Sequence, residues 1–196
     1  MTENLASTNP SPHDKPLWRR MISSGARLIL TIALAIGVAM ALRAFVVAPY
    51  SIPSGSMENT LLIGDCVFGR KFDVNPEPGE IITFTDPENP ARTLVKRVIA
   101  TEGQTIDIQN GHLIIDSGTV SEPYAVGVTE ALSGHASTLE GGITYPYTVP
   151  EGCIWVMGDN REHSADSRFF GPIDTTSVTS EVIFRYAPFD RIGDVR

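Results

Sequence analysis

The sequence Ile52-Pro53-Ser54-Gly55-Ser56-Met57 marks the point at which the chain changes character. A long apolar run precedes it, and short apolar segments separated by turn residues follow it. A serine hydroxyl becomes a nucleophile only when a base takes its proton. The Ser-x-x-Lys spacing that would supply a local base fails, because Asn59 stands in the lysine position. On its own the Ser-Gly-Ser tripeptide is typical of a loop, and a base would have to come from elsewhere in the chain.

The apolar run before this stretch covers residues 28–47. Three residues interrupt it: Thr31, Gly37 and Arg43. A helix of about 20 residues is about 30 Å long, which matches the hydrocarbon layer of a membrane. Arg43 lies near the far end, where its long side chain can reach the membrane surface. The sequence therefore predicts a single transmembrane helix over residues 28–48.

Charges on the two sides of this helix predict its orientation. Four basic residues precede it, namely Lys15, Arg19, Arg20 and Arg27. The positive-inside rule then places residues 1–27 in the cytoplasm, as a disordered polar tail, and the chain after Pro49 outside. A cleaved signal peptide is the competing interpretation, since Ala39-Met40-Ala41 imitates a cleavage site. The apolar run continues past this tripeptide, which favours an uncleaved anchor.

Composition limits what the outer part of the chain does. Residues 48–196 carry 10 basic and 21 acidic residues, and such an acidic domain is a poor candidate for binding nucleic acid. Cys66 and Cys153 match no metal-ligand spacing, and no histidine has a metal-like partner, so the sequence indicates no metal site. Outside the cell the two cysteines could pair or remain buried thiols, and the sequence does not decide between these.

The outer region has the pattern of a mainly β domain. Seven short apolar segments are bounded by turn residues: 66–68, 81–85, 93–100, 106–108, 112–115, 153–157 and 180–186. Asn110-Gly111 is a strong hairpin signal between two of them. Residues 116–150 are rich in Gly, Ser and Thr and are expected to form an insert or long loop. We expect residues 49–196 to form an antiparallel domain of the β-barrel or β-sandwich kind behind the membrane helix.

Two polar clusters interrupt these strands. Lys96-Arg97 lies inside the segment 93–100, where a lysine either faces solvent or is buried and becomes a general base. A second cluster, residues 158–168, follows the segment 153–157, and its Asp159 is a candidate for capping the turn. His163 in this cluster also allows a Ser-His-Asp triad with a neighbouring aspartate.

In order, these segments closely resemble the bacterial type I signal peptidases, from the anchor to the last strand. The matching stretches are Ile52–Met57 with Thr60-Leu61 for the nucleophile motif, Gly64-Asp65, Gly79-Glu80-Ile81, Val95-Lys96-Arg97-Val98 for the lysine motif, and Gly158–Arg161 with Ser164–Arg168 and Gly171 for the last motif. Each motif is moderately specific, and the ordered set is highly specific. Asn59, where the family commonly has proline, Glu162-His163, and the short region 116–150 depart from the family pattern.

The resemblance implies a role for individual residues. Ser56 would be the nucleophile and Lys96 the general base. Ser54 would donate to the oxyanion together with the Ser56 N–H. Ser164 would orient Lys96. The remaining implied positions are Asp159, Asp166 and Arg168 as support for the site, and Tyr50, Ile52, Leu61 and Val95 as the lining of the substrate pocket.

The resemblance also implies the reaction and its setting. The enzyme would cleave signal peptides from secreted preproteins after a small-x-small motif, through an acyl-enzyme and without metal or cofactor. Its partners would be preproteins delivered by the export machinery and the lipid bilayer of the plasma membrane, with no nucleic acid. Self-cleaving repressors share Ser-Lys chemistry, but they carry a DNA-binding domain in place of an anchor. A non-catalytic envelope-binding protein on the same scaffold and a hydrolase using His163 are two competing interpretations.

Overall fold

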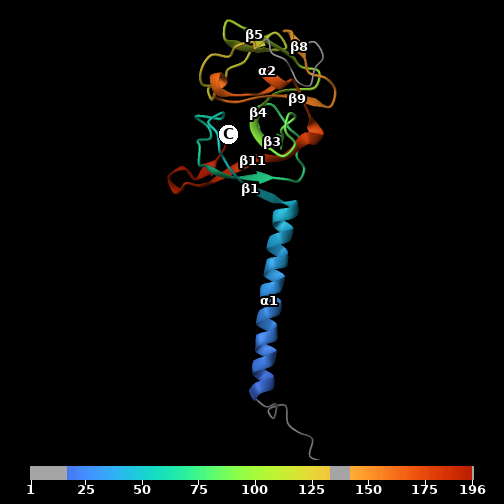
Figure 1. The fold of residues 1–196 in the computed structure, drawn as a ribbon, viewed down its shortest axis with the longest axis vertical. Helices are drawn as coiled ribbons and strands as arrows, with labels where there is room; N and C mark the ends of the chain where they lie inside the picture. The colour runs from blue at the N-terminus through green and yellow to red at the C-terminus, as the bar shows by residue number, and fades with distance from the viewer. Residues whose placement is uncertain (1–16, 133–141, 196) are drawn as a thin grey trace, which may run out of the picture. The chain divides into compact units, whose positions relative to one another are not determined.

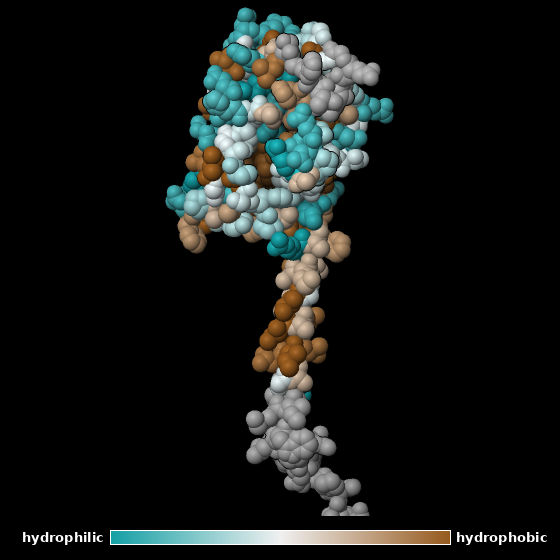
Figure 2. Space-filling view, in the orientation of Figure 1, coloured by the Kyte–Doolittle hydropathy of each residue, from teal (hydrophilic) through white to brown (hydrophobic). Residues whose placement is uncertain are grey.

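The computed structural model describes residues 17–132 and 142–195 of the chain, and the side chains from residue 25 onward. Two compact units are distinguished, Met1–Arg43 and Ala44–Arg196. Helix α1, Leu17–Phe45, makes up most of the first unit (Figure 1). Its segment Gly25–Phe45 is long and apolar enough to cross a membrane, and none of its side chains is buried. Figure 2 shows hydrophobic residues along this helix, the composition of a helix that is surrounded either by a protein core or by lipid.

The helix differs from the predicted one at both ends. It begins at Leu17, so residues 17–27, expected to be disordered, are helical, whereas the rest of the predicted tail lies outside the described residues. It ends at Phe45 rather than 48, and Val47 already belongs to a strand. The difference at the C-terminal end arises from the continuous apolar run, because periodicity alone cannot divide such a run between a helix and the strand that follows.

Eight strands of the second unit form one antiparallel sheet, in the order β1-β2-β11-β3-β4-β9-β10 with β12 paired to β11. The strands are β1 Val47–Ser51, β2 Cys66–Arg70, β3 Ile81–Thr85, β4 Thr93–Thr101, β9 Cys153–Met157, β10 Ile173–Asp174, β11 Val178–Ala187 and β12 Gly193–Asp194. Strand β11 is paired with β2, β3 and β12, and therefore connects the two halves of the sheet.

A smaller sheet has the order β7-β6-β5-β8. Its strands are β5 Thr105–Gln109, β6 His112–Ile115, β7 Gly118–Thr119 and β8 Tyr147–Thr148. Asn110 and Gly111 join β5 to β6 with φ angles of 51° and 80°, the left-handed conformation that a two-residue hairpin turn needs. The hairpin prediction is therefore confirmed. Four short helices complete the described chain: η1 Arg161–His163, α2 Ser167–Phe170, η2 Thr175–Ser177 and η3 Phe189–Arg191.

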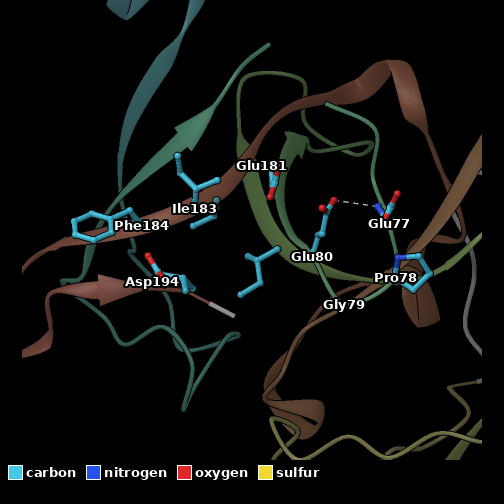
Figure 3. A pocket seen from close by; sticks show the side chains of 11 residues that line it. Glu77, Pro78, Gly79, Glu80, Glu181, Ile183, Phe184 and Asp194 are labelled. Atoms are coloured by element: carbon cyan, nitrogen blue, oxygen red, sulfur yellow. Dashed lines mark hydrogen bonds between the residues drawn. The ribbon is translucent and has the colours of Figure 1, made fainter. Parts of the chain in front are cut away.

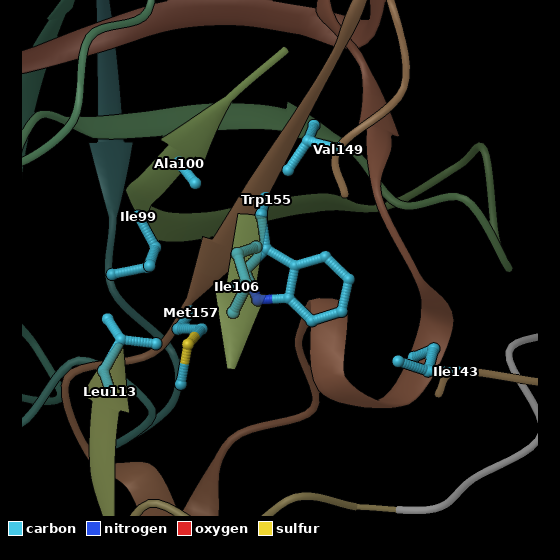
Figure 4. Packing of buried hydrophobic residues seen from close by; sticks show 8 residues of the cluster. All are labelled: Ile99, Ala100, Ile106, Leu113, Ile143, Val149, Trp155 and Met157. Carbon is cyan, nitrogen blue, oxygen red and sulfur yellow. The ribbon is translucent and has the colours of Figure 1, made fainter. Parts of the chain in front are cut away.

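Three hydrophobic clusters hold the domain together. The first lies between the small sheet and strands β4 and β9, with Trp155 completely buried among aliphatic side chains (Figure 4). The second lies beneath the loop that follows β1, and includes Met57 and Leu61. The third contains Phe84 and Phe170, whose rings meet edge to face at 6.2 Å. Packing two sheets face to face through the first cluster buries apolar surface from both, the main stabilising contribution in such a fold.

The mainly β, antiparallel class is confirmed, and all seven predicted segments lie in strands. The predicted insert at 116–150 is in part regular, since β7 and β8 extend the small sheet, while residues 133–141 lie outside the described chain. Cys66 and Cys153 are both free thiols. Strands β11, β3 and β4 lie between theirs, and at about 4.8 Å per strand the two cysteines are far beyond the roughly 7 Å that a disulfide allows.

Candidate active site

The loop between β1 and β2 presents the two serines. Its ends are held together, because the Ile52 N–H donates to Asp65 O at 2.9 Å and the Gly64 N–H donates to Ile52 O at 2.9 Å. Met57 and Leu61 point into the second hydrophobic cluster and are 1% and 0% exposed. These buried apolar side chains attach the loop to the core and leave its serines nearer the surface. Ser54 is exposed and Ser56 is half-buried.

Lys96 reaches Ser56 from strand β4. Its Nζ lies 2.7 Å from Ser56 Oγ, and its side chain is 3% exposed. Burial disfavours the charged ammonium and lowers the pKa of Lys96 from 10.5 to about 8. The lysine is therefore buried beside a serine, and the alternative of a solvent-facing lysine on a half-exposed strand does not hold.

Charged neighbours modify this effect in both directions. Asp166 and Asp159 raise the pKa of Lys96, while Arg168 and Arg92 lower it, and desolvation outweighs them all. Arg97 follows Lys96 directly in the chain, yet it is not among the principal causes of the lowered pKa. The geometry explains this, because the Arg97 guanidinium is occupied by a carboxylate of its own.

Arg97 connects three segments around the site. Its Nε and Nη2 donate to the two oxygens of Asp159 at 2.9 and 2.7 Å, and its Nη1 donates to Gly79 O at 2.6 Å. The Thr60 hydroxyl donates to Asp159 at 2.5 Å, which links the pair to the serine loop. The ring of Tyr124 lies 4.0 Å from the guanidinium carbon. Asp159 therefore forms a buried ion pair, and not the turn cap that its position in the sequence suggested.

Asp166 supports the site from the other end of the polar cluster. It caps helix α2 by accepting from the Arg168 N–H, and its oxygens accept from the Arg168 guanidinium at 2.9 Å and from the Gly158 N–H at 3.0 Å. Ser164 lies close by, since a Cβ on Gly158 would collide with Ser164 Oγ and with the carbonyl of Ser56. The Ser164 hydroxyl is buried and has no hydrogen-bond partner among the described residues, so its role in orienting Lys96 stays a prediction.

The four expected pocket residues lie together. Ile52 and Leu61 are buried in the second hydrophobic cluster, and Tyr50 and Val95 pack against it half-buried. The Tyr50 hydroxyl also lies within 3.3 Å of Ser180 Oγ. These apolar side chains lie in or next to the β1–β2 loop that carries the two serines. Their function as a pocket for small substrate side chains stays a prediction.

The histidine alternative finds no support in the geometry. His163 is exposed on η1, and its side chain makes no hydrogen bond within the described chain. Both candidate aspartates are engaged by arginines, Asp159 by Arg97 and Asp166 by Arg168. Ser56 therefore has an amine as its neighbour, and a Ser-His-Asp triad is not assembled.

A separate hollow of about 680 Å³ lies between β3, β11 and β12. Its wall carries four carboxylates, from Glu77, Glu80, Glu181 and Asp194, and Figure 3 shows Glu80 accepting from the Glu77 N–H. Burial, followed by the neighbouring carboxylates, raises the pKa of Glu80. Neither Ser56 nor Lys96 is among the residues that line this hollow.

The sequence did not predict that residues of the region 116–150 would contact the arginines around the site. Glu122 accepts from both terminal nitrogens of Arg161, at 2.6 and 2.7 Å, and Tyr124 stacks on Arg97. These contacts join residues 39 and 27 positions apart in the chain. Neither hydrophobic periodicity nor a local motif could have identified such contacts.

Comparison with known proteins identifies relatives over most of the chain. Residues 25–187 match the family described as signal peptidase, peptidase S26. The chain is 35% identical to a signal peptidase I of Bacillus caldolyticus, with 81% of this chain and 90% of that protein covered. It is 33% identical to a probable signal peptidase I-1 of Synechocystis, with 82% of each covered.

Two further matches cover a smaller share of one of the two proteins compared. A probable thylakoidal processing peptidase 2 of Arabidopsis thaliana is 31% identical over 82% of this chain, which spans only 44% of that protein. A solved signal peptidase I from Enterococcus faecalis is 34% identical, with a TM-score of 0.44 over 55% of this chain and 96% of the other.

Proposed function

Because the chain belongs to the signal peptidases of the S26 family, we propose that it removes signal peptides from exported preproteins as a Ser-Lys endopeptidase. The observation that carries this proposal is the pair formed by Lys96 and Ser56, with Nζ 2.7 Å from Oγ. A nucleophile and its base must lie within hydrogen-bond reach, and the base must be unprotonated when it acts. A buried amine with a pKa of about 8 meets both requirements near neutral pH.

The reaction follows from these two groups. Neutral Lys96 takes the Ser56 proton, and Oγ attacks the carbonyl carbon of the last signal-peptide residue. The tetrahedral oxyanion accepts hydrogen bonds from the Ser56 N–H and the Ser54 hydroxyl. The lysine returns its proton to the leaving amine, leaving an acyl-enzyme on Ser56. Lys96 then takes a proton from a water molecule as its oxygen attacks the ester carbonyl, and it returns this proton to Ser56 Oγ when the ester bond breaks.

The substrate binds as an extended strand. Strand β1 lies at one end of the large sheet, and β4 pairs with β9 only from Arg97 onward, so residues 93–96 have no partner on that side within the described chain. Free strand edges can pair with an extended peptide, and adjacent apolar pockets then select its side chains. Tyr50, Ile52, Leu61 and Val95 would accept small side chains at the first and third positions before the cut.

The anchor gives the enzyme its location. We place the N-terminus in the cytoplasm and the domain after Pro49 outside the plasma membrane. Three basic residues precede the span Gly25–Phe45 and Arg27 lies in its first turn, and the positive-inside rule puts such an end in the cytoplasm. Translocated preproteins present their cleavage regions at that membrane surface. Anchoring enzyme and substrate in one bilayer raises their effective concentration.

Incubation of the purified protein with a preprotein tests the proposal directly, with mass spectrometry to locate the cut. Wild type should cut after a small-x-small sequence, and Ser56→Ala should not. His163→Ala is the matched control, and it should retain most of the activity because this exposed side chain touches neither reacting group. Loss of turnover in His163→Ala, or retained cleavage in Ser56→Ala, would remove the Ser-Lys assignment. A non-catalytic scaffold would show no cleavage in any of the three.

A further inference from the structure

We propose that Asn160 is a positioning residue that orients the oxyanion-binding N–H of Ser56, an inference that rests on the proposed function. Asn160 lies in the loop after β9, and it is 9% exposed. Its side-chain Nδ2 donates to Gly55 O at 3.1 Å, and its backbone N–H donates to Ser56 O at 3.1 Å. One residue therefore holds the carbonyl groups on both sides of the nucleophile.

The bond to Gly55 determines where the Ser56 N–H points. The Gly55 carbonyl and the Ser56 N–H belong to the same peptide unit, which is trans. In a planar trans peptide the C=O and N–H bonds point in opposite directions. Holding the Gly55 oxygen toward Asn160 therefore turns the Ser56 N–H away from it. This N–H makes no hydrogen bond with any described residue, so it is available to an oxyanion.

The peptide needs such an anchor because Gly55 is conformationally permissive. The Glu58 N–H also donates to Gly55 O, at 3.2 Å, but it belongs to the same loop and moves with it. Asn160 instead connects the loop to a different part of the domain, 105 residues away in the chain. A hydrogen bond accepted by a peptide carbonyl also polarises the N–H of that peptide, which strengthens it as a donor.

Asn160 is itself fixed by the segment of the chain that the sequence indicated only as an insert. Val126 forms a parallel bridge with Asn160; its N–H donates to Asp159 O at 2.8 Å, and its carbonyl accepts from the Arg161 N–H at 2.8 Å. The Arg161–Glu122 ion pair, in which the Arg161 side chain is 0% exposed, holds the same segment. The residues on both sides of Asn160 are therefore held by Val126. The Asn160 side chain, which bonds to Gly55 O, connects this well-held segment to the loop that carries Ser56.

The test compares Asn160→Asp with Asn160→Ala. Aspartate keeps nearly the same shape but carries a charge in place of the amide donor, whereas alanine removes the donor without adding a charge; the bond to Gly55 is lost in both. The matched control is Asn59→Ala, because Asn59 is an exposed asparagine of the loop that carries Gly55 and Ser56, without a side-chain hydrogen bond to a described residue. Both Asn160 variants should lower kcat by about ten- to a hundredfold, less than the 10²–10³ typical for removing an oxyanion donor itself. KM and Tm should change little, and Asn59→Ala should behave as wild type.

A second readout needs no substrate. Loss of the bond to the Gly55 carbonyl should shift the carbonyl ¹³C resonance of Gly55 and the amide ¹⁵N resonance of Ser56 in both Asn160 variants, measured by NMR in micelles, but not in Asn59→Ala. Unchanged resonances would overturn the inference even if the protein cleaved no preprotein. Unchanged kcat in variants of a wild type that does cleave would overturn it while leaving the proposed function intact. A rise in KM alone would assign Asn160 to substrate binding and also overturn it.

Discussion

The buried amine of Lys96 makes the pH dependence of cleavage predictable. A pKa lowered from 10.5 to about 8 leaves about a tenth of the enzyme with a neutral lysine at pH 7. An unperturbed lysine would leave fewer than about one molecule in a thousand. Because kcat/KM reports the free enzyme, its acidic limb should have a midpoint near 8 and fall about tenfold per pH unit below it.

The assay is the initial rate of preprotein cleavage between pH 5.5 and 10.5 at substrate concentrations well below KM. Asn59→Ala should reproduce the wild-type midpoint. Lys96→Arg should be inactive at every pH, because a guanidinium cannot release its proton in a protein. A midpoint near 10, or a limb near 6.5 where an ordinary histidine titrates, would refute the assignment of a desolvated lysine base.

The same shift predicts a change in stability that does not depend on turnover. Between pH 8 and 10.5 the unfolded chain keeps the Lys96 proton while the folded protein has lost it, so the free energy of unfolding rises with pH. The lowered pKa corresponds to about 3 kcal/mol of destabilisation below pH 8, which disappears above 10.5. Lys96→Met should therefore gain stability relative to wild type at pH 7 and lose most of this gain by pH 10.5, measured by urea unfolding. A difference between the two proteins that stays constant with pH would contradict the shift.

Two further predictions concern the oxyanion and the topology. Ser54→Ala should lower kcat by about ten- to a thousandfold with KM little changed, and Ser54→Thr should retain more activity; a change in KM alone would assign Ser54 to substrate binding. Protease added to intact spheroplasts should digest the chain after Pro49 and leave the N-terminal tail protected. Digestion only after the membrane is opened would reverse the predicted orientation.

Local patterns predicted those features that local forces determine. Asn110-Gly111 gave the hairpin because both residues readily adopt positive φ, and the long apolar run gave the helix. The strand boundaries were less predictable. Two-residue strands such as β7 and β8 exist only because neighbouring strands offer hydrogen-bonding partners, and no pattern of two residues encodes that.

The serine–lysine pair was predictable only as an ordered set of motifs. Ser56 and Lys96 are 40 residues apart, and Arg97 and Asp159 are 62 apart. Taken alone, a lysine in an apolar segment favours a solvent-facing side chain on a half-exposed strand, so its burial could not be derived from its neighbours in the chain. The same holds for Asn160, whose bond to Gly55 depends on the folding of two distant loops against each other.

The two buried ion pairs explain how a lysine can lose its proton beside two aspartates. Asp159 and Asp166 both raise the pKa of Lys96, and an unpaired carboxylate in a buried site would do so strongly. Each is instead paired with an arginine through a bidentate hydrogen-bonded ion pair, Asp159 with Arg97 and Asp166 with Arg168. Arginine suits this role because it stays charged under all relevant conditions. The pairing leaves each carboxylate close to neutralised, so desolvation determines the pKa of Lys96 while the same carboxylates still hold the loops around Ser56 in place.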